Sequence, residues 1–282
     1  MSDEQPDQSK HRLTRRQTLG VAGAAGSAVV LGGGAGKVIS ALIEDPDEVT
    51  AATAAKSCRL TPEVTEGPFY VALDKIRRDI TESKPGVPLT LKIRVVDVKR
   101  CAPIHGAAID IWHCDAGGLY SDEASNGTSR QTYLRGVQLT NKKGYATLKT
   151  VYPGHYTGRA THIHLKVHIG GKARGGTLRG GHVSHTGQLF FAESANSSVY
   201  ALAPYSSDTA QRTLNSSDSI YSQAGGSSAE VSLKGSASSG FVGMIVLGVN
   251  PKARPALGGS TGIGVRAGAP QVELGAARGR SG

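Results

Sequence analysis

The sequence predicts an all-β protein, a mixed or antiparallel β-sandwich whose strands are joined by long loops. Short apolar runs recur through the middle of the chain, with strict alternation or many β-branched residues, and Gly, Pro and Asn separate them. No long stretch repeats its apolar residues with the period of about 3.6 that marks an amphipathic helix. Short strands at such spacing are typical of two sheets packed face to face.

The expected strands follow one another along residues 89–249. In chain order they are Leu89–Val98, Ala107–Asp115, Gly144–Pro153, His162–Ile169, Gln188–Glu193 and Phe241–Val249. The fourth is the clearest, because "HIHLKVHI" alternates apolar residues with His162, His164, Lys166 and His168. Since successive side chains of a strand point to opposite faces, these four polar residues share one face.

The N-terminal residues have the pattern of an export signal. In "TRRQTLG", Thr14–Gly20, two arginines precede a Gly/Ala-rich apolar run that is too short and too mild for a stable membrane anchor. "AATAA" at Ala51–Ala55 offers a small-residue cleavage site. We therefore expect residues 1–55 to be a twin-arginine signal and linker that brings the chain, through the twin-arginine export machinery, to the extracellular or cell-surface side. That route handles folded proteins, often with a cofactor already loaded, which favours a metal.

The remaining chain divides into one domain and a tail. Residues 251–282 are rich in Gly, Pro, Ala and Arg without apolar periodicity, which predicts a disordered tail. No internal repeat is evident between the signal and this tail. We expect residues 56–250 to form a single β-sandwich domain.

The formal net charge is +10, and the positive residues are scattered along the sequence. No basic run is interleaved with aromatic residues, so we expect no nucleic-acid partner. Two interpretations remain: attraction to anionic polymers or acidic aromatic substrates, and solubility alone.

Three cysteines in an exported chain permit one disulfide and leave one thiol. Cys58 lies just before the first motif of the domain, Cys101 lies at a turn between strands, and Cys114 lies in an apolar strand. We expect Cys58 to pair with Cys101 and Cys114 to be buried. The absence of a CxxC pair in the sequence argues against a thiolate zinc site.

The histidine strand is a candidate metal site. Residues two apart on a strand have Cα atoms roughly 6–7 Å apart, so His162 and His164 can reach one ion, whereas His168 lies too far along the same face. Zinc is the default ion for such a pair, and two surface histidines without a metal are the alternative. Tyr156, six residues before His162, and Tyr120, in a Gly-rich loop, are candidate ligands that could equally be packing residues.

Five motifs together carry a resemblance to a known family. They are "TEGPFY" (Thr65–Tyr70), "RRDITE" (Arg77–Glu82), "GAAIDIWHCDAGGLYSD" (Gly106–Asp122), the stretch from Tyr133 to Val167 and "GQLFFAE" (Gly187–Glu193). In order and character they resemble the intradiol ring-cleavage dioxygenases, in particular the exported branch that acts on catechol-type aromatics. The resemblance covers residues 58 to about 225.

The resemblance implies a non-haem ferric iron, one per chain, bound in a β-sandwich with long active-site loops. Its ligands would be Tyr120, Tyr156, His162 and His164, while Arg159 would face the substrate and Gln188 would orient substrate or oxygen. The chemistry agrees, because two phenolates neutralise a hard, triply charged ion and two neutral imidazoles complete the set without adding charge.

The implied activity is cleavage of a catechol-type ring between its two hydroxylated carbons with O2, giving a muconate-type diacid. Tyr156 would leave the iron and accept a substrate proton, and Arg159 would stabilise negative charge on the ring. The alternative is a non-catalytic β-sandwich that binds aromatic polymers. A zinc-dependent hydrolase on the same histidines lacks an evident acidic third ligand. Which catechol is cleaved, and the oligomeric state, stay open.

Other polar residues have structural interpretations. We expect Asp110 and Asp115 to fix loops by hydrogen bonds, and His182 and His185 to lie in a solvated loop. We expect Lys166 and His168 at the rim or solvent end of their strand face. Thr157 and Gly158 occupy a place where better-known family members carry a longer segment with an aromatic residue, which implies a more open pocket.

Overall fold

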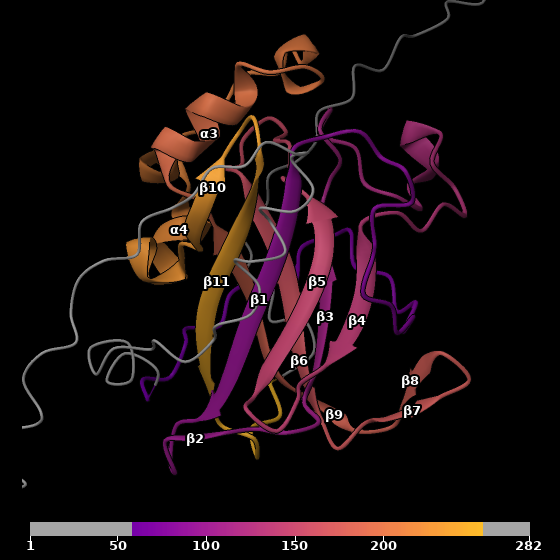
Figure 1. The fold of residues 1–282 in the computed structure, drawn as a ribbon, viewed down its shortest axis with the longest axis vertical. Helices are drawn as coiled ribbons and strands as arrows, with labels where there is room; N and C mark the ends of the chain where they lie inside the picture. Colours follow the sequence, from indigo (N-terminus) through magenta and orange to yellow (C-terminus); the bar gives the residue numbers. More distant parts are fainter. Residues whose placement is uncertain (1–57, 256–282) are drawn as a thin grey trace, which may run out of the picture. The chain divides into compact units, whose positions relative to one another are not determined.

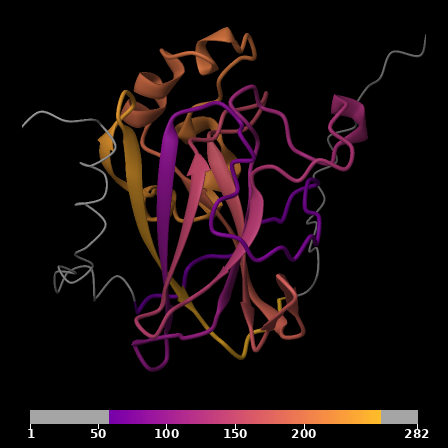
Figure 2. The ribbon, with the colours of Figure 1, turned by 45° about the vertical axis from the view of Figure 1, so that its right-hand side comes forward.

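The structure, a computed structural model, describes residues 58–255. Two β-sheets packed face to face are the main feature of this part of the chain (Figures 1 and 2). The predicted signal at 1–55 and residues 256–282 of the predicted tail lie outside the described residues. Within residues 58–255, no helix is long and apolar enough to cross a membrane.

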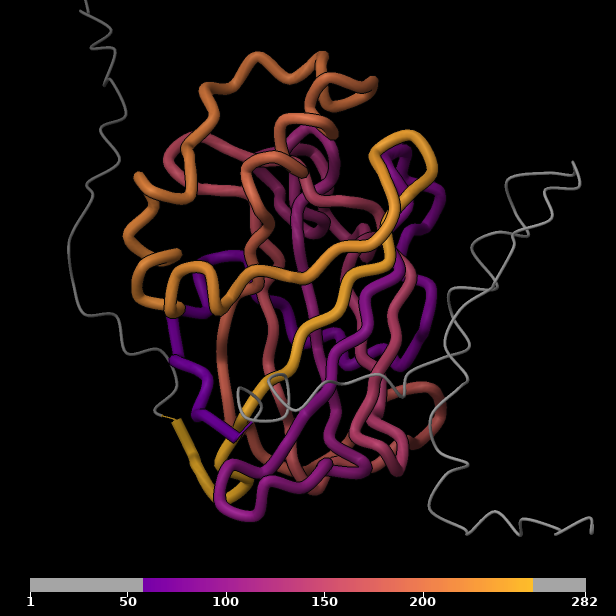
Figure 3. Tube along the Cα trace, turned by 60° about the vertical axis from the view of Figure 1, so that its left-hand side comes forward, coloured from indigo at the N-terminus to yellow at the C-terminus, as the bar shows by residue number. Residues whose placement is uncertain are grey.

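The first sheet is mixed and five-stranded. Its strands are β1 (Pro88–Asp97), β2 (Ala102–Pro103), β5 (Tyr145–Val151), β10 (Ser232–Ser236) and β11 (Gly240–Val249). β1 runs parallel to β11 and antiparallel to β5 and β2, and β10 lies antiparallel to β11. The parallel pair brings together segments far apart in sequence, which Figure 3 shows side by side.

The second sheet is four-stranded and antiparallel, in the order β4-β3-β6-β9. Its strands are β3 (Ala108–Trp112), β4 (Arg135–Leu139), β6 (His162–Ile169) and β9 (His182–Phe190). Between β6 and β9 the chain forms a small hairpin of β7 (Lys172–Arg174) and β8 (Thr177–Arg179). β6 therefore lies inside the sheet, paired on both edges.

The core lies between the sheets. Leu91 and Ile93 of β1, Ile109 of β3, and Ile163 and Leu165 of β6 are all fully buried in it. Since side chains alternate along a strand, the histidines of β6 must lie on the face turned away from this core.

Short helices follow β9 and lie on the same side of the sandwich as β10 (Figure 1). They are α3 (Glu193–Tyr200), α4 (Ser219–Gln223) and the 3-10 turns η2 (Tyr205–Ser207), η3 (Asn215–Ser217) and η4 (Gly226–Ala229), while η1 (Ala124–Asn126) precedes β4. α4 begins where it does because Asp218 is its N-cap, accepting from the backbone N–H groups of Ile220 and Tyr221.

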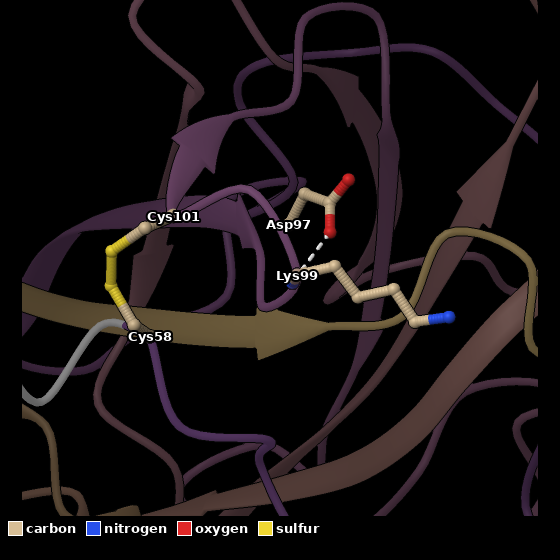
Figure 4. Close-up of a disulfide and its surroundings, with 4 residues drawn as sticks. All are labelled: Cys58, Asp97, Lys99 and Cys101. Atoms are coloured by element: carbon tan, nitrogen blue, oxygen red, sulfur yellow. Dashed lines mark hydrogen bonds between the residues drawn. A yellow bond between two sulfur atoms is a disulfide. The ribbon is translucent and has the colours of Figure 1, made fainter.

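The predicted disulfide is confirmed. Cys58 and Cys101 are bonded, with Cα atoms 5.1 Å apart, and Cys114 is a buried free thiol. Figure 4 shows the bond beside the turn after β1, where Asp97 Oδ1 accepts from the backbone N–H of Lys99 at 2.8 Å. The bond ties the first described residues to the end of β1.

The predicted fold class is confirmed, and strands appear at 88–97, 145–151, 162–169 and 240–249. The strand predicted at Ala107–Asp115 ends at Trp112, because the Asp115 side chain closes a turn with Gly117 and Leu119. β4 and β10 were not predicted.

The solvated loop expected around His182 and His185 was wrong. β9 begins at His182, and His185 is buried. The local sequence is rich in Gly and Ser, but pairing with β6 supplies the hydrogen bonds that hold it as a strand.

Candidate metal centre

Four polar atoms converge on the outer face of β6. His162 Nε2 lies 3.0 Å from His164 Nε2, 3.3 Å from the Tyr156 hydroxyl and 3.5 Å from the Tyr120 hydroxyl. Three of these side chains are buried and Tyr156 is half-buried. The structure thus brings together all four residues that the resemblance named as ligands.

The two histidines are positioned by β6 and by what packs on it. His164 pairs in register with Trp112 of β3, and the two rings stack with centroids 5.0 Å apart. On the other side Gly67 has φ +73°, and a Cβ there would lie 3.0 Å from His164 Cε1. The glycine of the "TEGPFY" motif therefore allows the chain to pass directly over the His164 ring.

Tyr120 is held by the loop that follows β3. Asp115 Oδ1 accepts from the backbone of Gly117 and Leu119, both at 3.0 Å, which confirms the loop-fixing role predicted for Asp115. Thr128 donates to the Tyr120 carbonyl at 2.7 Å, and the Phe69 ring stacks on the Tyr120 ring at 4.3 Å. Tyr120 is thereby held in place by a hydrogen bond to its backbone and by stacking on its ring.

Burial keeps the imidazoles neutral. Burial first, and the Arg159 charge next, lower the pKa of His162 to about 3. The pKa of His164 is also lowered, by burial first and by its neighbours next. His162 Nδ1 lies 2.6 Å from the Ala160 carbonyl and donates to it, which leaves the lone pair on Nε2, facing the other three groups.

Burial also raises the pKa of Tyr120 and of Tyr156. Both phenols are therefore neutral at pH 7 unless a cation binds beside them. A bound cation reverses this preference, because it stabilises phenolate oxygens directly.

The donor set fits a single metal ion. His162 Nε2 has one lone pair, yet three polar atoms lie within 3.5 Å of it. Metal–nitrogen distances of about 2.0–2.1 Å place neighbouring donors about 3.0–3.6 Å apart, which is the range seen here. Within the described residues, no group of three or more His, Cys, Asp and Glu side chains could hold a metal ion.

Arg159 and Gln188 lie together beside this centre. Arg159 Nε donates to Asp218 Oδ2 at 2.9 Å, and its Nη2 donates to Gln188 Oε1 at 2.5 Å. Gln188 Nε2 in turn donates to the Thr65 carbonyl at 3.0 Å. The guanidinium is mostly buried, so its direction is set by these two partners.

Asp218 was missed by the sequence reasoning. Besides capping α4 it accepts from the backbone N–H of Ala160 at 2.8 Å, next to Arg159. Burial would raise the pKa of Asp218, but the Arg159 charge and the Ala160 N–H outweigh it and lower the pKa. Its only sequence signal is an acidic residue ahead of a short helix, which does not indicate contact with an arginine 59 residues away.

A pocket of about 450 Å³ lies beside the turn between Tyr156 and Arg159. Thr157 and Gly158 line one side, and Arg212, Leu214 and Ser217 are among the residues of the other. The sequence predicted a more open pocket at Thr157 and Gly158, and both residues line this one.

In the second half of the β6 outer face Lys166 is buried, so the rim position predicted for it was wrong, whereas His168 is only partly buried and lies toward the end of the strand. Lys166 is 4% exposed, is ion-paired with Glu66, and holds its Nζ 3.5 Å above the centre of the Tyr70 ring. Tyr70 donates to Asp110 Oδ2 at 3.1 Å. Residues 66–70 cover this face, which no alternation pattern within β6 could reveal.

Comparisons with known proteins find relatives of this chain in sequence and in structure. The sequence model of a family described as "Dioxygenase" matches residues 65–177. The solved intradiol ring-cleavage dioxygenase of Tetranychus urticae is 33% identical, with 71% of this chain and 98% of that chain covered and a TM-score of 0.64.

Two curated relatives match a shorter segment. Catechol 1,2-dioxygenase 1 of Acinetobacter lwoffii is 32% identical over 105 residues, and catechol 1,2-dioxygenase of Pseudomonas sp. (strain EST1001) is 33% identical over 101 residues. Each match covers 34% of this chain and 32% of the relative, so the chain spans about a third of the length of these relatives.

Proposed function

The chain belongs to the intradiol ring-cleavage dioxygenase family, and from that premise we propose that it cleaves catechol-type aromatics with O2. The ring would open between the two hydroxylated carbons and give a muconate-type diacid. The observation that carries this proposal is the convergence of two phenol oxygens and two imidazole nitrogens on one buried point.

Tyr120, Tyr156, His162 and His164 would hold one ferric ion per chain. When bound, this ion would supply Lewis acidity toward the catechol and make the ring reactive toward O2. The four side chains contribute two negative charges once both phenols lose their protons, which suits a hard trivalent cation in a buried site.

Tyr156 is the proton acceptor in this proposal. It is half-buried where Tyr120 is fully buried, and it lies in a turn rather than under a stacked ring. Burial raises the pKa of Tyr156, whereas the neighbouring Arg159 lowers it and so favours the phenolate. A phenolate at this position can take a proton from a catechol hydroxyl onto its own Oη.

Arg159 and Gln188 orient and stabilise the substrate. The Arg159 charge is fixed by Asp218, so it is aimed before the substrate arrives and needs no reorganisation. Gln188 joins Arg159 to the Thr65 carbonyl, next to the segment that packs over His164.

The test is oxygen uptake by the iron-loaded chain with a panel of catechol, hydroxyquinol, protocatechuate and lignin-derived catechols. We expect uptake coupled to the formation of a ring-opened diacid, one O2 consumed for each ring. Full iron occupancy without uptake on any member would contradict the activity and favour a binding module.

We also propose export through the twin-arginine route, with residues 1–55 as signal and linker. The Cys58–Cys101 disulfide supports an oxidising compartment, since such bonds are rare in the cytosol. Arg15→Lys with Arg16→Lys should retain the protein inside producing cells, whereas the unaltered chain should be found outside. Equal distribution of both would contradict the proposal.

A further inference from the structure

Exposed lysines and arginines gather at the end of the sandwich farthest from His162. Five segments meet there, residues 58–62, 98–107, 140–144, 170–181 and 250–255, and we call them the basic end. They lie beyond Ile169, the last residue of β6, roughly 25 Å along that strand from His162. The cations that look scattered along the sequence are thus neighbours in the fold.

Strand pairing explains why these segments meet. β1 and β11 are parallel and end together, with Asp97 opposite Val249, so the turn after β1 lies beside the segment after β11. In the other sheet, Ile169 pairs with His182 at the base of the β7–β8 hairpin. His182 Nε2 lies 3.2 Å from the Pro251 carbonyl and so connects the ends of the two sheets.

Positive charge predominates at this end, and the acids next to it are the exposed Glu63, which follows residue 62, and Asp74, whose carbonyl accepts from the Leu178 N–H of the hairpin at 2.8 Å. The five segments contain exposed Lys and Arg side chains and no Asp or Glu. The nearby acid Asp97 is buried, accepts from the Lys99 backbone and lies 3.9 Å from Arg100. The basic end therefore presents a positive field to solvent.

The β7–β8 hairpin carries the densest charge. Lys172, Arg174 and Arg179 are all exposed on it, and Lys172 lies directly opposite Arg179 in the ladder. Like charges directly opposite one another on paired strands destabilise the pair, and an anion bound between them removes that cost. Leu178, buried against Ala108 and Val137, fixes the hairpin to the second sheet.

The turn after β1 is equally well fixed. The Cys58–Cys101 disulfide holds Cys58 beside the turn that contains Lys99 (Figure 4), and Arg59 and Arg100 are the chain neighbours of the two bonded cysteines. The cations of the basic end are thus displayed on turns whose backbones are anchored by strand pairing and by this bond. A preorganised set of charges loses less conformational entropy when it binds.

The composition of the basic end distinguishes between anionic partners. Its five segments contain no Phe, Tyr or Trp, so they lack the stacking side chains that single-stranded nucleic acids use. Leu60, 60% exposed beside Arg59, adds one apolar side chain. Cations on several turns at one end suit a broad anionic surface, and an isolated exposed leucine suits the interface of a bilayer.

We propose that the basic end docks the protein on an anionic lipid bilayer. Binding is peripheral and electrostatic, with the hairpin cations, Lys252 and Arg254 above the lipid phosphates. The candidate metal centre, at the opposite end of β6, then remains directed away from the membrane.

Vesicle flotation of the full chain tests this proposal. We expect binding to vesicles of phosphatidylglycerol mixed with phosphatidylcholine, weaker binding to pure phosphatidylcholine, and release between about 0.05 and 0.5 M NaCl because salt screens exposed charges. Each cation near an anionic surface contributes about 1 kcal/mol, or about fivefold in partitioning.

The hairpin variant K172Q/R174Q/R179Q should therefore bind about 100-fold more weakly. A matched control, R78Q/R130Q/K234Q, removes three exposed charges outside the basic end and should bind like the unaltered chain. Both variants keep residues 1–57, so any contribution of that segment is the same in each. Circular dichroism and iron content verify that both fold.

Two results would overturn the proposal. One is equal loss of vesicle binding in the hairpin variant and the control, which would reduce the effect to net charge. The other is tighter binding to duplex DNA or an anionic polysaccharide than to the anionic vesicles, which would assign the basic end to a different partner.

Discussion

The two halves of the β6 outer face look alike in sequence and differ in their chemistry. The first half, His162 and His164, is buried with two phenols and without a charged partner bonded to the imidazoles. The second half holds a buried lysine whose charge is balanced by Glu66. Alternation along β6 places the polar groups on one face. The residues that cover each half determine whether a polar group is ion-paired, as Lys166 is with Glu66, or lies among neutral groups.

Removing a ligand should have the largest effect. His164→Ala and Tyr120→Phe each take one donor from the proposed iron site, so we expect iron content to fall and turnover to disappear. Metal analysis beside oxygen uptake measures both. Normal iron content with full turnover in either variant would remove that residue from the ligand set.

Arg159→Ala comes next in size. Because its charge would stabilise negative charge on the substrate in the proposed function, its loss should lower kcat by about 10²- to 10³-fold while iron stays bound. Arg159→Lys should recover only part of this, since lysine cannot reach Asp218 and Gln188 with the same fork. An unchanged kcat in Arg159→Ala would refute its assigned role.

Asp218 offers a smaller and more discriminating effect. Asp218→Asn keeps a good N-cap for α4 but removes the charge that fixes Arg159, so we expect kcat to fall by about 10- to 100-fold with unchanged stability. Asp218→Ala should lose about 1 kcal/mol of stability as well. Thermal unfolding measures the loss of the helix cap, and steady-state kinetics measure the loss of the charge beside Arg159. Wild-type turnover in both the Asn and the Ala variant would show that Asp218 only caps the helix.

Changes in the second half of the face should leave turnover nearly intact. Lys166→Met leaves the partly exposed Glu66 and the buried Asp110 without their cation, so we expect the free energy of unfolding to fall by about 2 kcal/mol. A loss of turnover comparable to that of Arg159→Ala, in a folded and iron-loaded variant, would mean that the two halves act as one site.

The ionisation of Asp110 should make the free energy of unfolding depend on pH. Burial raises the pKa of Asp110 from 3.8 to about 7, so between these values the folded chain binds more protons than the unfolded chain. The contribution of this group to stability therefore falls as the pH rises from about 4 to about 7, and levels off above that. Asp110→Asn should remove this slope, and parallel unfolding curves for both proteins across the window would contradict the burial of a titrating carboxyl.

The sequence predicted the elements whose pattern is local. The strand at His162–Ile169 has the predicted bounds because alternation is a property of neighbouring residues. The pairing of Cys58 with Cys101 followed from their places at the domain start and at a turn. Tyr120 and Tyr156 could be named as ligands only through the family resemblance, because either tyrosine alone could be a packing residue.

What could not be predicted depends on segments that meet in space. The sequence predicted Lys166 at the solvent end of its strand, but residues 66–70 cover it. His185 lies in β9, which is a strand because it pairs with β6. Asp218 bonds to Arg159 although 59 residues separate them along the chain. The basic end is a further case, since its charges are brought together only by strand register.

The most direct test of the account is the visible absorption of the purified, iron-loaded chain. Two phenolates bound to ferric iron should give an intense ligand-to-metal charge-transfer band, which should weaken in Tyr120→Phe and shift when a catechol is added. A colourless protein at full iron occupancy would contradict the central claim that Tyr120, Tyr156, His162 and His164 together form the metal site.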